Sequence, residues 1–249
     1  MTDTTDWYAP AERLEATAVR MIELLELPTT ERKETYAISL LARSISNFGA
    51  VIGLLRNGFV IEARTVMRCC WENTFYLARI ARDSEAFVER MVKDDLTTRR
   101  AMGERLFQQN LVERGTAAEE ELRRFLKTLE ADKGRSLTPK GIADGGPIAN
   151  GYIIYMTVSD DAAHPTVRSL SRHLREGPES GIITGLNISL PVDEEEVIET
   201  LDFACGALIG GCYAFSETMG GGRAAREVKE RLAEMERLKG LGVADEEAL

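Results

Sequence analysis

The sequence predicts an all-α protein, built as one helical bundle of about seven to eight helices. Three observations support this fold class. Strong helix formers (Ala, Leu, Glu and Arg) dominate the composition. Apolar residues recur at helical spacing along nearly the whole chain. Glycine and proline gather in two breaks, residues 132–151 and 176–191, which predict a long loop and a minor extended segment. We expect a single domain over residues 1–249, with its core in residues 10–131 and 150–219.

Three helices are expected in the first third of the chain. The first covers residues 10–27. Thr29 or Thr30 caps the second, which ends at the helix stop of Asn57 and Gly58. The third covers residues 59–81 and begins almost at once, so the second and third helices should pack antiparallel.

The remaining helices follow with short connections. They are expected over residues 84–109, 117–131, 152–158, 193–219 and 223–239, with a strand over residues 182–190. Asp193 should cap the long helix over residues 193–219, and the three glutamates that follow it oppose the positive end of the helix dipole. The helix over residues 223–239 has one apolar stripe, which predicts that it docks on the bundle or on another subunit.

Composition excludes several classes of protein. The net charge of −10 disfavours broad binding to nucleic acid or to an anionic membrane. The acidic first residues predict no signal peptide, and the longest apolar run, 13 residues, is too short to span a bilayer. Four cysteines in apolar helical contexts predict buried free thiols. We therefore expect a cytoplasmic protein without a membrane segment.

The third helix carries charges on faces that otherwise belong to a core. Arg64, Arg68 and Glu72 follow one another at four-residue spacing, which places them on one narrow stripe. Unpaired burial would cost several kcal/mol, so these groups need partners or water. Helical projection of the next helix places Asp95 and Arg99 in the middle of its apolar face. The two stripes predict a shared polar centre, either an ion-pair network that fixes helix register or a ligand pocket.

Both histidines lie in one polar segment, YMTVSDDAAHPTVRSLSRHL. Tyr155 and Ser159 lie one turn apart on the short helix that opens it. Pro165 predicts a new helix start, with His164 at the entrance, where the helix dipole favours an anion and a neutral imidazole. We expect His164 to face the polar centre, and Arg168 follows it on the new helix. A histidine that only hydrogen-bonds the loop is the alternative.

Motifs for metal and cofactor chemistry are missing from the sequence. It contains no glycine-rich phosphate loop, no HExxH and no pair of ExxH motifs of the di-iron type. We predict no metal and no cofactor.

Two resemblances follow from these residues. The stretch from EARTVMRCCWENTFYL to DAAHPTVRSL, spanning residues 58–172, resembles an uncharacterised family of bacterial helical proteins. The matching positions are Arg68, Glu72, Asp95, Ser159 and His164. This resemblance implies a helical bundle and no established activity.

The looser resemblance is to the HEPN superfamily of helical bundles, many of them ribonucleases with an Arg-x4-6-His motif. Arg168 and His173 have four residues between them, which fits that spacing. The residue after the arginine is Ser169, where the superfamily usually has Asn, Asp or His.

Two functional hypotheses follow. In the first, the protein is a homodimeric, non-catalytic or regulatory module that dimerises through an apolar helix face. Its pocket binds a small anionic ligand or a partner and contains these residues: Arg64, Arg68, Glu72, Asp95, Arg99, Tyr155, Ser159 and His164. In the second, implied by the looser resemblance, it is a metal-independent ribonuclease in a defence or toxin–antitoxin role. Its catalytic residues are then His164, Arg168 and His173.

Overall fold

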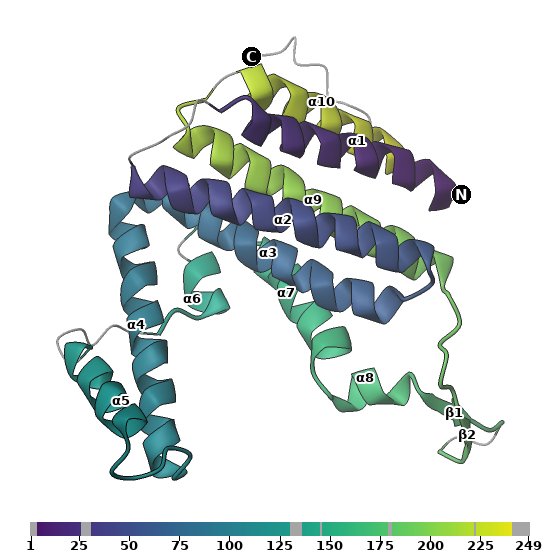
Figure 1. Cartoon of the computed structure of the whole chain (residues 1–249). Helices are drawn as coiled ribbons and strands as arrows, with labels where there is room; N and C mark the ends of the chain where they lie inside the picture. Colours follow the sequence, from purple (N-terminus) through teal and green to yellow (C-terminus); the bar gives the residue numbers. More distant parts are fainter. Residues whose placement is uncertain are drawn as a thin grey trace.

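The computed structural model describes residues 4–25, 31–129, 136–144, 146–178, 181–221 and 223–240. Three long helices form the centre of the molecule: α2 (Arg32–Arg56), α3 (Val60–Asp83) and α9 (Glu194–Thr218). They contact one another along their lengths, and α2 and α3 run antiparallel, as predicted (Figure 1). The all-α fold class is confirmed.

Two further helices cover one side of this centre. They are α1 (Thr4–Glu23) and α10 (Arg223–Leu238), which pack on each other and on α9 (Figure 1). The apolar stripe of α10 faces this contact, since Val228 and Met235 are fully buried. The predicted docking helix therefore docks on its own bundle.

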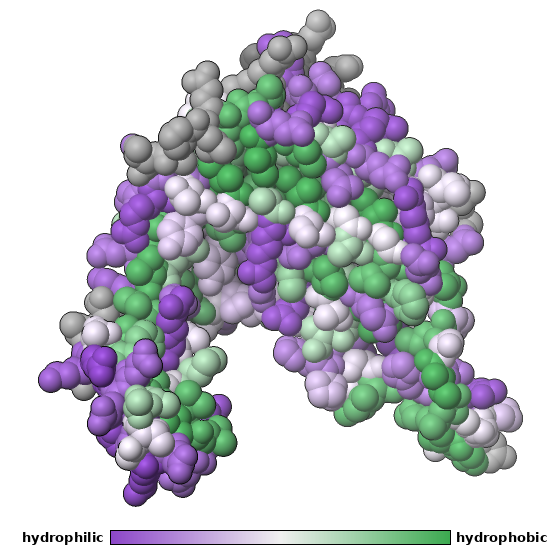
Figure 2. All heavy atoms as spheres, in the orientation of Figure 1, coloured by the Kyte–Doolittle hydropathy of each residue, from purple (hydrophilic) through white to green (hydrophobic). Residues whose placement is uncertain are grey.

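Two arms extend from the other side of the bundle and leave a notch between them (Figures 1 and 2). One arm is α4 (Glu85–Gln108) with α5 (Ala117–Thr128). The other arm begins with α7 (Gly151–Val158), continues as the π-helical turn η1 (Ser159–Ala163) and α8 (Val167–Ser171), and ends in a hairpin. The hairpin pairs β1 (Leu174–Glu176) antiparallel with β2 (Ile183–Leu186). We call α7, η1, α8 and this hairpin together the hairpin arm.

Several element boundaries differ from those predicted. Helix α1 begins at Thr4, so Pro10 lies inside it; the helix extends upstream because Trp7 is buried in the core. The predicted loop contains a short helix, α6 (Pro139–Ala143), whose start is capped by the Thr138 side chain. The strand predicted over residues 182–190 is shorter and pairs with β1. Thr29 and Thr30 lie outside the described residues.

The predicted start of α9 after Asp193 is confirmed, and so is the predicted capping by the Asp193 side chain. The Asp193 side chain accepts a hydrogen bond from the Glu195 backbone N–H at 3.0 Å. All four cysteines are free, as predicted; three are buried and Cys69 is half-buried. Burial raises the pKa of Cys70 and of Cys212 to about 12, so both stay protonated thiols.

Among the described helices, α2 and α9 are long and apolar enough to cross a membrane by length and composition. Both form the centre of the bundle, and a core helix of a soluble protein passes the same test. This finding is weak and places the protein in no compartment.

Candidate functional site

The charged stripe of α3 lies where the sequence placed it, but it faces different partners. Arg64, Arg68 and Glu72 contact the hairpin arm and α9. They form two clusters one helical turn apart. In one cluster the charged groups pair with one another, although the buried Arg64 Nε makes no hydrogen bond. In the other cluster, side chains that reach solvent keep hydrogen-bonding groups unused.

The closed cluster is centred on Asp161, whose side chain is 1% exposed. Its carboxylate accepts from Arg172 Nε to Oδ1 at 3.0 Å, and Arg64 Nε lies 3.3 Å from Oδ2. Arg168 Nε lies 3.3 Å from Oδ1. Three arginines therefore surround one buried carboxylate. We call this set, with its partners on α9, the closed network.

Helix α9 completes the closed network with two glutamates in its first turns. Arg172 donates from Nη1 to Glu196 Oε2 at 3.1 Å and from Nη2 to Oε1 at 2.6 Å. Arg64 donates from Nη1 to Glu199 Oε2 at 2.7 Å. Three arginines thus meet three carboxylates, so the network carries no surplus charge for a ligand. It ties the hairpin arm to α3 and α9.

At Arg172, pairing with carboxylates affects the pKa of the guanidinium more than burial does. Burial would lower the pKa of its guanidinium, but hydrogen bonds to Glu196 and Asp161 raise the pKa above its ordinary value. Arg64 is the most enclosed member, with a side chain 3% exposed. A charge this deeply buried is tolerated only because carboxylates surround it.

The second cluster joins α3 to α7, and we call it the open cluster. Arg68 donates from Nε to the Tyr155 hydroxyl at 3.1 Å and from Nη2 to Glu72 Oε1 at 2.8 Å. The Tyr155 hydroxyl donates to the same Glu72 oxygen at 2.8 Å. The arginine and glutamate side chains are 24% and 27% exposed. Within the described residues, Arg68 Nη1 and Glu72 Oε2 have no protein hydrogen bond.

Aromatic rings and a buried hydroxyl border the open cluster. The Arg68 guanidinium lies 5.2 Å from the Tyr155 ring centroid, and Tyr152 stacks on Tyr155 with centroids 5.6 Å apart. Ser159 follows one turn later, and its buried Oγ has no partner within the described structure. Burial, and next the hydrogen bond to Glu72, raises the pKa of Tyr155, while Arg68 opposes the rise.

The turn that carries Ser159 and Asp161 is π-helical. Both side chains are buried against α3, in the stretch where α7 passes into η1. Single π-helical turns within helices are frequent at functional sites. Local sequence gave no indication of this turn.

The prediction for Asp95 and Arg99 was wrong. They pair with each other at 2.9 Å on the outside of α4, with side chains 55% and 60% exposed. The neighbouring Asp94 accepts a hydrogen bond from the Leu137 backbone N–H. The cause is that α4 leaves the bundle, and its buried Gly103 packs on α5 instead of on α3.

The prediction for His164 was also wrong. Its side chain is exposed, and Thr166 instead caps α8 by accepting from the Ser169 backbone N–H. His173 is exposed too, with Nδ1 3.0 Å from the Asn187 carbonyl oxygen. Arg168 binds Asp161. No hydrogen bond or ion pair in the described structure joins any two of the three predicted catalytic residues, His164, Arg168 and His173.

Sequence reasoning did not connect the residues that complete the closed network with α3: Asp161, Arg172, Glu196 and Glu199. The acidic run at the start of α9 was assigned only to the helix dipole. A signal was present in the four-residue spacing of Arg168 and Arg172, which places both on one side of α8.

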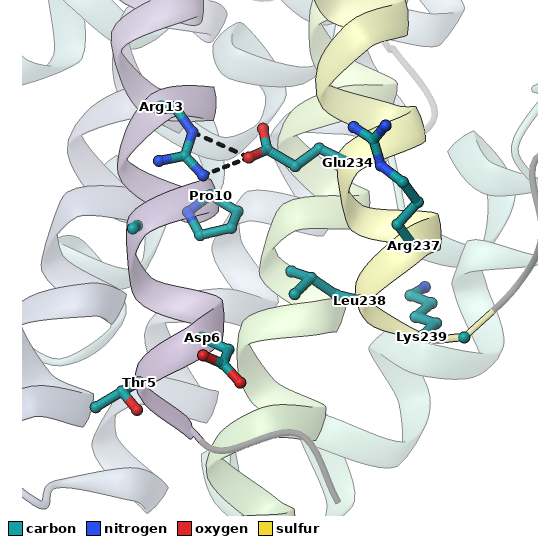
Figure 3. A pocket seen from close by; sticks show the side chains of 10 residues that line it. Thr5, Asp6, Pro10, Arg13, Glu234, Arg237, Leu238 and Lys239 are labelled. Carbon is teal, nitrogen blue, oxygen red and sulfur yellow. Dashed lines mark hydrogen bonds and ion pairs between the residues drawn. The ribbon is translucent and has the colours of Figure 1, made fainter.

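Two cavities lie away from the open cluster. A groove of about 750 Å³ lies between α1 and α10, and there Arg13 binds Glu234 across it (Figure 3). A smaller cleft of about 440 Å³ lies beside the closed network, and its lining mixes apolar residues with Arg172, His173 and Glu196. Among the described residues, no group of three or more His, Cys, Asp or Glu is placed to hold a metal ion.

Comparison with known proteins identifies a family and no activity. No curated protein and no solved structure matches the chain. The comparisons do not bear on the HEPN resemblance, which stays a prediction. A family model matches residues 34–182, more than half of the chain, and this span holds the open cluster and Asp161. The chain therefore belongs to the family of unknown function DUF5677.

Proposed function

We propose that the protein is a non-catalytic helical module that binds a small ligand at the open cluster. The observation that carries the proposal is an unused donor beside an unused acceptor, Arg68 Nη1 and Glu72 Oε2, on side chains about one-quarter exposed. Both side chains stand on the central helix and reach solvent, so a ligand can approach them.

The chemistry of the open cluster favours a ligand that carries an acceptor and a donor side by side. One arginine and one glutamate leave no net charge, so an anion alone would be repelled by the Glu72 carboxylate. A carboxamide or the edge of a nucleobase presents both groups at suitable spacing. The Tyr155 ring is buried against Tyr152 and the Arg68 guanidinium, which holds its hydroxyl in place beside Glu72.

Ser159 adds a third polar contact. Its buried hydroxyl lacks a partner in the described structure and lies one turn from Tyr155. A ligand atom or a bound water there would satisfy it. The closed network is a poorer binding site, because its guanidiniums and carboxylates already pair with one another.

The proposal is tested by thermal unfolding with three probes: nicotinamide, adenine and cytosine. The melting temperature of the wild type should rise with at least one probe, because a ligand that binds only the folded state stabilises it. The rise corresponds to about 2.7 kcal/mol at a hundredfold excess over Kd, which is roughly 5–10 °C at this chain length. Arg68→Met and Tyr155→Phe should lose the rise.

Arg99→Met is the matched control. It also removes the arginine of a four-residue arginine–carboxylate pair, but on the outside of α4. It should keep the full rise in melting temperature. A wild type that responds to none of the probes, or an Arg68→Met variant that responds as the wild type does, contradicts the proposal.

A further inference from the structure

The hairpin arm exposes an unusual amount of apolar surface. Six apolar side chains between α8 and the start of α9, in addition to Ile182, are 47–94% exposed. They are Val167, Leu170, Ile183, Leu186, Ile188 and Val192. Figure 2 shows hydrophobic residues gathered on this arm, at the place that the hairpin occupies in Figure 1.

The exposure does not come from a loosely attached arm. The closed network fixes α8 and η1 to α3 and α9 through Arg172 and Asp161. The two strands contact mainly each other, and nearly all their residues are exposed. A two-stranded hairpin needs a covering element for stability, and here the described residues supply none.

The exposed area fits a permanent protein interface. With roughly 170–200 Å² for each fully exposed residue, the six side chains offer on the order of 750 Å², close to the 800 Å² per partner of a standard interface. The largest apolar patch of a typical monomer is only about 300–600 Å². Apolar interfaces of this kind are characteristic of homodimers.

We propose that a second copy of this chain covers the hairpin arm, forming a two-fold symmetric dimer through these six side chains. The interface is thus the apolar surface of the hairpin arm. It is separate from the open cluster, and it does not depend on a ligand there.

Sedimentation velocity and light scattering test the proposal on the full chain. The wild type should be a dimer at micromolar concentration. Leu186→Asp and Ile188→Asp should each raise the dissociation constant on the order of 30-fold or more, as loss of an interface hot spot does. Met102→Asp is the matched control, since Met102 is 65% exposed on the other arm, and it should leave the dimer unchanged.

A monomeric wild type overturns the proposal, including one that cosediments with vesicles of phosphatidylcholine and phosphatidylglycerol, which would assign the arm to a membrane. A dimer that Met102→Asp breaks and Ile188→Asp does not also overturns it.

Discussion

The closed network and the open cluster stand one helical turn apart on α3, yet their chemistry differs. In the closed network, Arg64 and Arg172 share three carboxylates, and its most buried groups are almost inaccessible. In the open cluster, one arginine meets one glutamate and one hydroxyl, and about a quarter of each charged side chain reaches solvent. Similar residue types thus fix an element in one place and leave binding capacity in the other. The number of charged partners decides whether a cluster fixes an element or keeps the capacity to bind a ligand.

The largest effect is expected from Asp161→Ala. This change leaves Arg64 buried without its central carboxylate, and losing one partner of a buried pair costs about 3–5 kcal/mol. Urea unfolding measures the loss. Asp160→Ala is the control, since Asp160 is exposed, and it should change stability by less than about 0.5 kcal/mol. Equal effects of the two variants would contradict the role of the closed network.

Arg172→Met should have the second largest effect. Arg172 is 25% exposed and joins Asp161 to Glu196. Its loss should cost about 1.5–3 kcal/mol, the value of hydrogen bonds to charged groups. Hydrogen exchange should also accelerate in α8 and β1, because the hairpin arm loses its anchor. Arg168→Met, at a 62% exposed arginine, should cost under about 1 kcal/mol. Unchanged exchange in Arg172→Met would show that the network does not hold the arm.

Substitutions in the open cluster should lower the free energy of unfolding only slightly, but they should strongly reduce ligand binding. Arg68→Met should cost under about 1 kcal/mol, because solvent already compensates a partly exposed pair. Tyr155→Phe should cost about 1 kcal/mol for the hydroxyl hydrogen bonds. Calorimetric unfolding measures the loss of stability in these variants, which is then compared with the loss in the variants of the closed network. A loss as large as that of Asp161→Ala would make the open cluster a second structural network.

The smallest effect is a pH dependence of stability from Tyr155. Its pKa in the folded protein is raised above the ordinary value of 10.0, mainly by burial. The raised pKa contributes stability that is fully present below pH 10 and is lost as the pH rises through the folded-state pKa. Between pH 9 and pH 11, the urea midpoint of the wild type should fall more than that of Tyr155→Phe. Equal falls would contradict this contribution.

The sequence determined the helices and much of the open cluster. Helical spacing predicted α3 as a central helix with Arg64, Arg68 and Glu72 on one stripe, and it placed Tyr155 and Ser159 on one face. Capping chemistry fixed the start of α9 at Asp193. These features depend on residues close together in the chain, where periodicity and hydrogen-bonding capacity are readable.

Only the tertiary structure decided which surfaces meet. Periodicity assigned an inner face to α4, but α4 leaves the bundle, so Asp95 and Arg99 lie outside. His164 lies at the entrance of α8, as its place before Pro165 predicts, but its side chain is exposed and does not face the open cluster. Asp161 became the centre of the closed network through contacts with Arg64, 97 positions away in the printed sequence. Local patterns specify faces of helices, whereas pairing between faces depends on packing across the whole chain.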